Sequence, residues 1–474
     1  MKQRPVIVGG GPAGMGAAIE LAKHGVNSIL LDEAPRLGGV VYRGPLRQGV
    51  VMDYLGQSYI NAMQKLHQDF ARIANNVDVH LNSRVLGTEA NQRLHVLDSK
   101  EQLISIDYQH LLLSTGCHER NVPFPGWTLP GVMLLGGLQL QIKSGVVNPL
   151  GRTVIAGTGP LLPLVACQLH RAGAEIVGVY EASAFNRIAR STLSLLNQPQ
   201  LLLDGLSMIA YLKRHHIPLH FGWGIVSAEG QSELQQVTLA PYDENWQIDY
   251  LQKQQISAET LAVGYGFIPR TQLTQLMDLQ HQYHKDGYLQ PCHNDWQQSS
   301  QPHIHLAGDI SGLRGSEAAM LSGKIAALSI LRQRGDLTEA QAEHQRMIYQ
   351  RKLNAILRFR VGIDAFIRPG MGQLGLQQAD TVICRCENVT RKDIDRALDQ
   401  GIQDMLSLKI RTRVGMGDCQ GKMCVGYCSD RLREYTGKHD VKWIRPRFPI
   451  DPLPFSALNS DLIVINSPEK ANHE

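Results

Sequence analysis

Residues 6–14 read VIVGGGPAG and decide the fold predicted for the first part of this chain. The apolar run breaks into glycines and continues as residues 15–22, MGAAIELA, which have helical periodicity. We therefore expect a strand, a tight turn and a helix. The glycines fit the G-x-G-x-x-G spacing, which permits a tight turn, a close approach to a pyrophosphate and tight helix–strand packing. The dinucleotide contacts predicted on this turn are Gly9, Gly11, Pro12, Ala13 and Gly14.

A second apolar run, residues 28–31, ends in Asp32 and Glu33, roughly 20 residues beyond the turn. An acidic side chain in this position holds a ribose hydroxyl of a bound dinucleotide. We predict Glu33 for this role, with Asp32 as the alternative. A glycine-rich turn without a ligand is the simpler interpretation, but the order of strand, helix, second strand and acid favours a nucleotide site.

The composition is that of a globular protein of several domains. The 474 residues are 43% hydrophobic and 19% charged, which permits packed cores and argues against global disorder. The net charge of +4 is too small to predict nucleic-acid binding. Residues 1–4 lead directly into the first predicted strand, so we expect no signal peptide. No apolar run approaches the roughly 18 residues of a membrane span. We expect a cytoplasmic protein that reaches the inner membrane only through partners.

Two further segments could extend the first nucleotide site. Gly39 lies in a Leu-Gly-Gly sequence whose backbone could approach a cofactor, and Arg43 follows it. Val85 lies in a strand-like segment that could bring it near an adenine. Each of these signals is weak alone, since an ordinary loop or strand has the same sequence.

Residues 152–162, RTVIAGTGPLL, predict a second strand, turn and helix. Gly157 and Gly159 fit the motif, but Leu162 replaces the third glycine and would thicken the helix–strand contact. Glu181 ends the next apolar run and is placed to hold a ribose hydroxyl. The sequence leaves three alternatives for this unit, which are NAD, another adenine nucleotide and a structural remnant that binds nothing.

Five of the eight cysteines lie in one C-terminal segment. Cys384 and Cys386 form a C-x-C pair, and Cys419 and Cys424 form a C-x4-C pair further on. Four thiolates from two tight loops suit a [2Fe–2S] cluster, although four cysteines also bind zinc. Cys428 follows Cys424 by one helical turn and could replace it as a ligand.

The order of these motifs resembles that of flavoproteins with two dinucleotide-binding domains. The resemblance implies an α/β fold of nested Rossmann-like domains, with FAD on the first glycine-rich turn. It also implies that residues 111–116, LLLSTG, and 304–309, IHLAGD, end at the flavin. The FAD contacts that it implies there are Thr115, Gly116, Gly308 and Asp309. An ordinary N-cap is the simpler role for Asp309, and both roles are compatible.

The cysteine segment resembles [2Fe–2S] modules of the bacterioferritin-associated-ferredoxin type, through residues 382–390, VICRCENVT, and 412–424, TRVGMGDCQGKMC. Together with residues 39–43 and 157–162, it resembles more narrowly the FAD-dependent subunits of hetero-oligomeric, dye-linked amino-acid dehydrogenases. That family includes the opine oxidase A subunit, the hydrogen cyanide synthase B subunit and the proline dehydrogenase alpha subunit. The likeness covers residues 3 to about 440.

This resemblance implies an electron-relaying oxidoreductase subunit. Its implied partners are an amino-acid-oxidase-like flavoprotein, which oxidises an amino acid or opine, and a small ferredoxin-like subunit. Residues 38–42, GGVVY, lack the redox cysteine pair of disulfide reductases, so electrons should pass through iron–sulfur. No residue is predicted to act in catalysis. A reductase that takes electrons from NAD(P)H is the alternative, and a scaffold whose cofactors only assemble a complex is a third possibility.

The predicted domains follow from the positions of these motifs. The FAD domain is split around a nested domain, and a helical linker leads to the cysteine module. A C-terminal tail, expected to be flexible or bound to a partner, ends the chain. The predicted ranges are 1–125 with 265–335 (FAD), 126–264 (nested, NAD(P)-like), 336–380 (linker), 381–445 ([2Fe–2S]) and 446–474 (tail).

Overall fold

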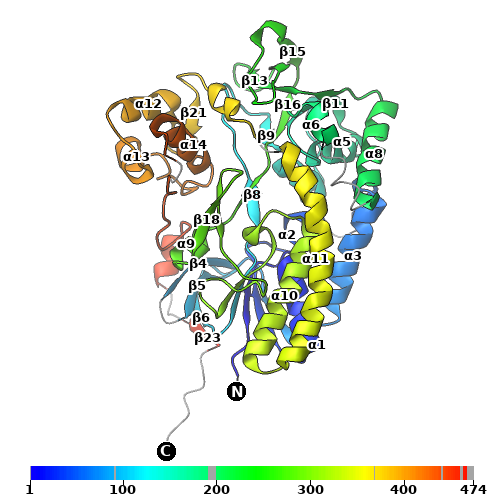
Figure 1. Ribbon diagram of the computed structural model, residues 1–474, viewed down its shortest axis with the longest axis vertical. Coiled ribbons are helices and arrows are strands. Elements are labelled where there is room, and N and C mark those ends of the chain that lie inside the picture. The colour runs from blue at the N-terminus through cyan, green and yellow to red at the C-terminus, as the bar shows by residue number, and fades with distance from the viewer. Residues whose placement is uncertain are drawn as a thin grey trace, which may run out of the picture.

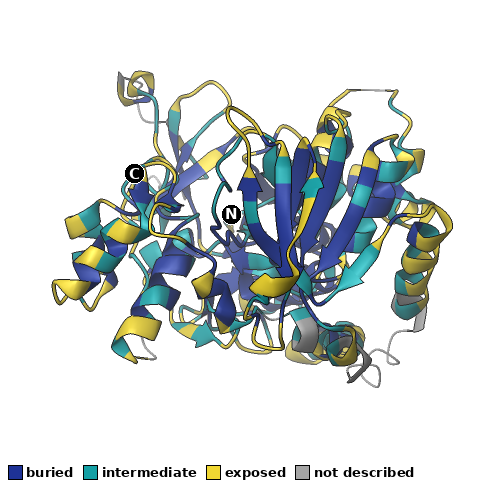
Figure 2. Cartoon of the chain, turned by 90° about the horizontal axis from the view of Figure 1, so that it is seen from above, coloured by how far each residue is buried: buried dark blue, intermediate teal, exposed yellow. Residues whose placement is uncertain are grey.

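The computed structural model describes residues 2–47, 49–89, 92–190, 199–367, 369–438, 441–459 and 463–466. Two parallel sheets and a small helical module at one side make up the molecule (Figure 1). The sheet strands are buried, and the helices around them expose only their outer faces (Figure 2). None of the described helices combines the length and apolar character that crossing a membrane requires.

The first sheet has the strand order β20-β7-β1-β2-β3, and each pair of neighbouring strands is parallel. Its central strand is an apolar run because both faces of the sheet are buried, one under helices and the other under a second sheet. The connections leave β1 in opposite directions, so its carboxyl end is a topological switch point, where such sheets bind ligands. The strands are β1 (Val6–Val8), β2 (Ser28–Leu31), β3 (Val77–His80), β7 (Leu111–Leu113) and β20 (Ile304–Leu306).

Three helices cover this sheet, and two of them pack closely against each other. The helix that follows the glycine-rich turn lies along the helix that follows β20, and a Cβ on Gly323 would lie only 2.0 Å from the Ala13 carbonyl oxygen. The helices are α1 (Pro12–Lys23), α3 (Gln57–Ala71) and α10 (Ser316–Arg334).

A four-stranded sheet, in the order β23-β6-β5-β4, packs beside the first sheet. Its last strand comes from the C-terminal segment, where residues 463–465 pair in parallel with β6. The expectation of a flexible or partner-bound tail is wrong for these residues, because their backbone groups pair with an edge strand of this chain's own sheet. Residues 467–474 lie outside the described residues. The strands are β4 (Arg84–Glu89), β5 (Arg93–Leu97), β6 (Leu103–Asp107) and β23 (Ile463–Ile465).

The second parallel sheet has the order β12-β11-β10-β16-β9 and repeats the first in plan, with its own glycine-rich turn after the central strand. Its helices are α4 (Leu135–Leu140), α5 (Leu161–Arg171) and α8 (Pro199–Arg214), and a three-stranded sheet, β13-β14-β15, packs on it. The strands are β9 (Val132–Leu134), β10 (Arg152–Gly157), β11 (Glu175–Glu181), β12 (Leu219–Phe221), β13 (Trp223–Glu229), β14 (Gln236–Pro241), β15 (Gln254–Ser257) and β16 (Thr260–Gly264).

Two elements join the sheets. A ribbon of β8 (Cys117–Glu119) and β17 (Phe267–Pro269) carries the chain between them. The long helix α11 (Glu339–Ile367) packs on α10 and ends at the second domain (Figure 1).

The cysteine module has its own hydrophobic core and lies at the side of the molecule (Figure 1). Its first helix begins at a capping box, in which Thr390 and Asp393 bond each other's backbone N–H groups. The elements are β21 (Val382–Cys384), β22 (Val389–Thr390), α12 (Arg391–Asp399), α13 (Met405–Thr412) and α14 (Val425–Thr436).

Candidate flavin site and cysteine centre

The first glycine-rich turn leaves no space for side chains at its outer positions. Gly9 has φ +105°, a conformation that favours glycine. A Cβ on Gly14 would lie 1.9 Å from the Gly9 carbonyl oxygen, so α1 can approach β1 only with a glycine there. Helix α1 begins at Pro12, whose missing N–H costs nothing at a helix start. The free N–H groups of this first turn point to a site for an anion.

The two acidic candidates after β2 have different environments. Asp32 is buried and accepts hydrogen bonds from the backbone N–H groups of Gly10, at 2.5 Å, and Ala34, at 2.7 Å. Burial raises its pKa, partly offset by these donors. Glu33 is more exposed and pairs with Arg270 at 2.5 Å. Burial raises the pKa of Glu33, but the Arg270 charge outweighs that effect and lowers it overall. Asp32 thus braces the turn, which leaves Glu33 the freer group for a ribose.

The segment around Gly39 faces the turn. The nearest atom to a Cβ built on Gly11 is the Gly39 Cα, at 3.8 Å, so two residues without side chains face each other. The Arg43 Nε atom is buried and has no hydrogen-bond partner among the described residues. A buried guanidinium nitrogen needs an anionic or polar partner, and a phosphate of FAD meets that need.

Lys143 lies close to Arg43 and was not expected from the sequence. Its side chain is 3% exposed and donates to the carbonyl oxygens of Val40, at 3.1 Å, and Val41, at 3.4 Å. Burial, and then the Arg43 charge, lower the pKa of Lys143 to about 7. A lone lysine after α4 carries no motif that sequence inspection could find.

The two strand ends expected at the flavin meet the first turn. A Cβ on Gly9 would lie 2.3 Å from the Ser114 carbonyl oxygen, and one on Gly308 would lie 2.9 Å from the Ala13 Cβ. Asp309 accepts from the Arg314 backbone N–H, at 3.1 Å, and lies 3.5 Å from the Cys117 sulfur. Asp309 thus makes an ordinary loop contact and also faces the space beside the first turn.

The remaining three candidates of this site are Thr115, Gly116 and Val85. Thr115 donates to the Arg270 carbonyl oxygen at 3.2 Å, and Gly116 has φ +72°. Val85 is 8% exposed and packs in the core shared by the first sheet and the β4–β6 sheet.

The second glycine-rich turn differs from the first in what surrounds it. Glu181 is buried and its carboxylate accepts from the backbone N–H groups of Gly159, at 2.7 Å, and Ser183, at 2.9 Å. Burial raises its pKa. Leu162 is 1% exposed and fills the core between α5 and the sheet. The Ile367 side chain at the end of α11 would lie 3.1 Å from a Cβ on Gly159, so α11 approaches this turn.

The cysteines of the C-terminal module lie in neighbouring pairs. Cys384 contacts Cys424 through their thiols, and Cys386 contacts Cys419 in the same way. The contact with Cys424, and then burial, raise the pKa of Cys384. Within the described ranges, no three Cys, His, Asp or Glu side chains converge on one point. Two pairs fit a centre with two irons, each of which takes two thiolates.

The loops that carry these two cysteine pairs approach each other closely. A Cβ on Gly417 would lie 2.2 Å from the Cys386 Cβ, so the loops that carry the two predicted pairs of ligands meet there. Cys428 is buried and contacts Cys424. Cys384 and Cys424 thus form one pair of contacting thiols. Cys428 lies one helical turn beyond Cys424.

The cysteine module contacts the ribbon between the two sheets. The His118 Nε2 atom on β8 lies 3.1 Å from the Lys422 carbonyl oxygen, in the loop between Cys419 and Cys424. Burial lowers the pKa of His118 to about 4, so the ring is neutral and Nε2–H must donate to that carbonyl. The Trp127 Nε1–H donates to the Val382 carbonyl oxygen at 2.6 Å. Sequence inspection did not single out these docking residues, because they contact each other only across domains.

Residues 3–332 match the family described as pyridine nucleotide-disulphide oxidoreductase, and residues 382–435 match the BFD-like [2Fe-2S] binding domain. The chain therefore belongs to the pyridine nucleotide-disulphide oxidoreductase family, with an added iron–sulfur domain. It is a flavin-dependent oxidoreductase, and FAD and a [2Fe–2S] cluster are its cofactors.

More particular relatives share the whole arrangement. The chain is 65% identical to hydrogen cyanide synthase subunit HcnB of Pseudomonas protegens over 96% of this chain and 97% of that one. It is 29% identical to the opine oxidase A subunit of Agrobacterium tumefaciens over 96% of this chain and 90% of that one. The L-proline dehydrogenase structure from P. horikoshii has a TM-score of 0.70 and 20% identity, covering 97% of this chain and 80% of that one. This last likeness concerns the fold alone.

Proposed function

We propose that this chain is the FAD- and iron–sulfur-containing subunit of a hetero-oligomeric amino-acid dehydrogenase. It would take the electrons that a partner flavoprotein, similar to an amino-acid oxidase, removes from a substrate, and deliver them to an acceptor. A small ferredoxin-like subunit is a further proposed partner, and the complex would work in the cytoplasm or on the inner membrane through those partners. The names of both relatives as subunits support this proposal.

The identity of 65% to HcnB favours hydrogen cyanide formation over opine, proline or hydroxyproline oxidation. Hydrogen cyanide keeps one carbon–nitrogen bond and no side chain, so glycine is the amino acid that can supply it. The balanced reaction is glycine → HCN + CO2 + 4 H+ + 4 e−. Four electrons leave each substrate molecule, which gives a reason for a dedicated electron-relaying subunit.

The observation that carries the proposal is the position of β8 between the two cofactor sites. Cys117 of this strand lies 3.5 Å from Asp309, which is predicted to hold FAD, and His118 bonds the loop between two cluster ligands. When bound, FAD accepts electrons in pairs and a [2Fe–2S] cluster passes them singly. The cysteines of β8 and α5 are free thiols rather than a redox disulfide, which agrees with transfer through iron–sulfur.

The residues proposed to hold FAD surround the first turn. The α1 N–H groups and Arg43 would bind the phosphates, Glu33 a ribose, and Asp309 the ribitol. Cys384, Cys386, Cys419 and Cys424 would hold the cluster. The cations next to these cysteines in the sequence are paired with carboxylates, Arg413 with Glu387 and Lys422 with Asp451.

An NAD(P)H-dependent reductase is the alternative function, since the second glycine-rich turn is present. Two apolar side chains argue against it. Ile367 lies against Gly159, and Leu162 fills the place where the motif has its third glycine. A nucleotide in this domain would have to displace the end of α11.

The test compares electron donors under anaerobic conditions. The complex of this chain with its flavoprotein partner is mixed with glycine, proline, an opine or NADH, and the reduced cluster is followed by electron paramagnetic resonance. We expect glycine to produce the reduced-cluster signal and to reduce a dye, but only with the partner present. A Cys386→Ser variant, which should lose the cluster, is the matched control for dye reduction.

Two results would contradict the proposal. Reduction of the cluster in the isolated chain by NADH would favour the alternative function. Amino-acid oxidation by the isolated chain would place the substrate site here and remove the need for the partner.

A further inference from the structure

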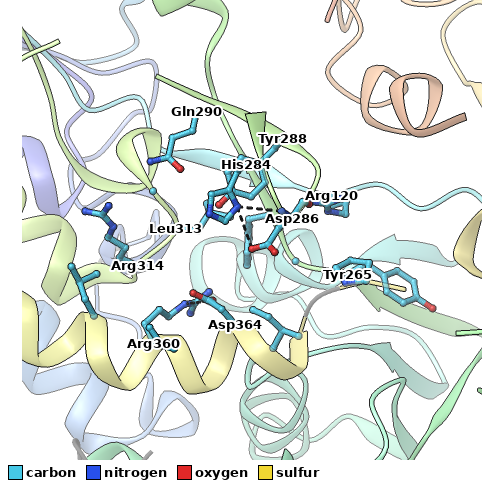
Figure 3. A pocket seen from close by; sticks show the side chains of 17 residues that line it. Arg120, Tyr265, His284, Asp286, Tyr288, Gln290, Leu313, Arg314, Arg360 and Asp364 are labelled. Carbon is cyan, nitrogen blue, oxygen red and sulfur yellow. Dashed lines mark hydrogen bonds and ion pairs between the residues drawn. The ribbon is translucent and has the colours of Figure 1, made fainter. Parts of the chain in front are cut away.

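A cavity of about 200 Å³ lies where the first domain, the ribbon and α11 meet. Its walls come from three places that are far apart in the sequence: the loop before α10, the hairpin of β18 (His281–His284) and β19 (Tyr288–Pro291), and the last turns of α11 (Figure 3). None of its charged side chains has a role in the function proposed above.

Among the described residues, one cationic side chain that lines the cavity has neither an ion pair nor a hydrogen bond. Arg360 pairs with Asp364 at 2.8 Å, and His284 pairs with Asp286 at 3.3 Å, as the dashed lines in Figure 3 mark. Arg120 donates to the Asp286 carbonyl oxygen. Arg314 also lines the cavity, but its guanidinium forms no ion pair or hydrogen bond with any side chain or backbone group that the structure describes.

A guanidinium in this position needs an anion. Arg314 is only partly exposed, and burial lowers its pKa, which no nearby carboxylate fully reverses. Taking a cation out of water without a partner is costly, so structures normally pair such groups. A guanidinium holds a carboxylate through two parallel hydrogen bonds, which gives both strength and orientation.

The cavity has room for a small anion. Its volume of about 200 Å³ far exceeds the roughly 10–15 Å³ that a single water molecule needs on the same measure. The Gln290 amide donates one N–H to the Ser311 carbonyl oxygen at 2.7 Å and has one further N–H. One guanidinium without a partner among the described residues suits one carboxylate.

We infer that this cavity is a binding site for a small organic monocarboxylate, held by Arg314. The site adjoins the loop that carries Asp309, since the Arg314 backbone N–H donates to that side chain. The inference stands apart from the proposed function, because a carboxylate can bind here whether or not the chain relays electrons.

The test is calorimetric titration of the chain loaded with FAD and cluster, in the presence and absence of its partner. The probes are sodium acetate, glycine and pyruvate, with sodium chloride at equal ionic strength as the control. We expect saturable binding of at least one carboxylate, with a Kd on the order of 1 mM, and none of chloride. The Arg314→Gln variant should bind at least tenfold more weakly, whereas Arg314→Lys should retain part of the affinity because it keeps the charge.

Two further variants separate the site from general effects. Arg72→Gln removes an exposed arginine charge elsewhere and should change nothing. Val361 lines the cavity but is 64% exposed, so Val361→Trp should obstruct the cavity without disturbing a core, and should weaken binding.

The inference is overturned if no carboxylate binds saturably, or if Arg314→Gln binds as tightly as the unmodified chain. It is also overturned if Arg314→Gln loses FAD while the unmodified chain binds no carboxylate, since Arg314 would then serve the flavin. Failure of glycine to reduce the cluster would contradict the proposed function alone.

Discussion

The Gly14→Ala substitution tests the flavin site at its tightest point. Its methyl group would lie 1.9 Å from the Gly9 carbonyl oxygen, where real contacts essentially never fall below 3.0 Å. Because the obstacle is backbone, α1 must move by at least 3.0 − 1.9 = 1.1 Å. The first turn of α1 moves with it, away from the place where the pyrophosphate is proposed to bind.

The magnitude follows from the length of a hydrogen bond. An N–H···O bond of about 2.9 Å that lengthens by 1.1 Å reaches about 4.0 Å and is lost. Hydrogen bonds to charged groups contribute about 1.5–3 kcal/mol each. Loss of two at the low end costs about 3 kcal/mol, so FAD should bind on the order of a hundredfold more weakly. Overpacking should also lower the free energy of unfolding by about 1–3 kcal/mol.

The assay measures FAD content by absorbance and the FAD Kd by flavin fluorescence quenching. The matched control is Gly205→Ala in α8, which places the same methyl group on a helical glycine with no neighbour within 4 Å. That variant should keep FAD and gain up to about 1 kcal/mol of helix stability. Iron content should stay unchanged in both, because the cysteine module has its own core. A Gly14→Ala protein that binds FAD within threefold of the unmodified chain would refute the reasoning.

Three more outcomes are expected. Cys424→Ser should lose the iron and the acid-labile sulfide, measured chemically on anaerobic protein, whereas Cys428→Ser should keep both; the reverse would make Cys428 the ligand in place of Cys424. Burial raises the pKa of Glu119 from 4.5 to about 7, so ionisation of this group should destabilise the fold as pH rises. Because the carboxyl ionises at a lower pH in the unfolded chain, the free energy of unfolding should fall by up to about 3 kcal/mol between pH 4.5 and 7. Chemical unfolding should show a smaller fall in Glu119→Gln, and equal pH profiles would contradict this. Trp127→Phe removes one hydrogen bond of about 1 kcal/mol, so amide exchange near Val382 should be roughly fivefold faster, and unchanged exchange would mean that this bond does not dock the module.

Sequence inspection identified the family and the cofactors because their signals are local. The glycine spacing at residues 9–14 predicts a strand–turn–helix unit. The steric limits of this unit lie within a few residues, as the 1.9 Å between a Cβ built on Gly14 and the Gly9 carbonyl oxygen shows. The C-x-C and C-x4-C spacings in the same way report two short ligand loops, and the structure brings their thiols together in pairs.

Contacts across domains were not predictable, since nothing in a linear pattern indicates which distant groups meet. Asp32 and Glu33 are adjacent, yet one turns to the Gly10 N–H and the other to Arg270. The tail was expected to be flexible or bound to a partner, but residues 463–465 pair with β6 of the same chain.

The sequence by itself thus determined the class of protein, the two glycine-rich turns and the four cysteines, because each depends on sterics or chemistry within a short segment. Only the tertiary structure decided that α11 ends against the second turn, that β8 lies between Asp309 and the loop of Cys419 and Cys424, and that the Arg314 guanidinium faces a cavity with no ion pair to any residue that the structure describes. Each of these depends on which surfaces are buried against each other when the domains pack, and residues hundreds of positions apart supply them.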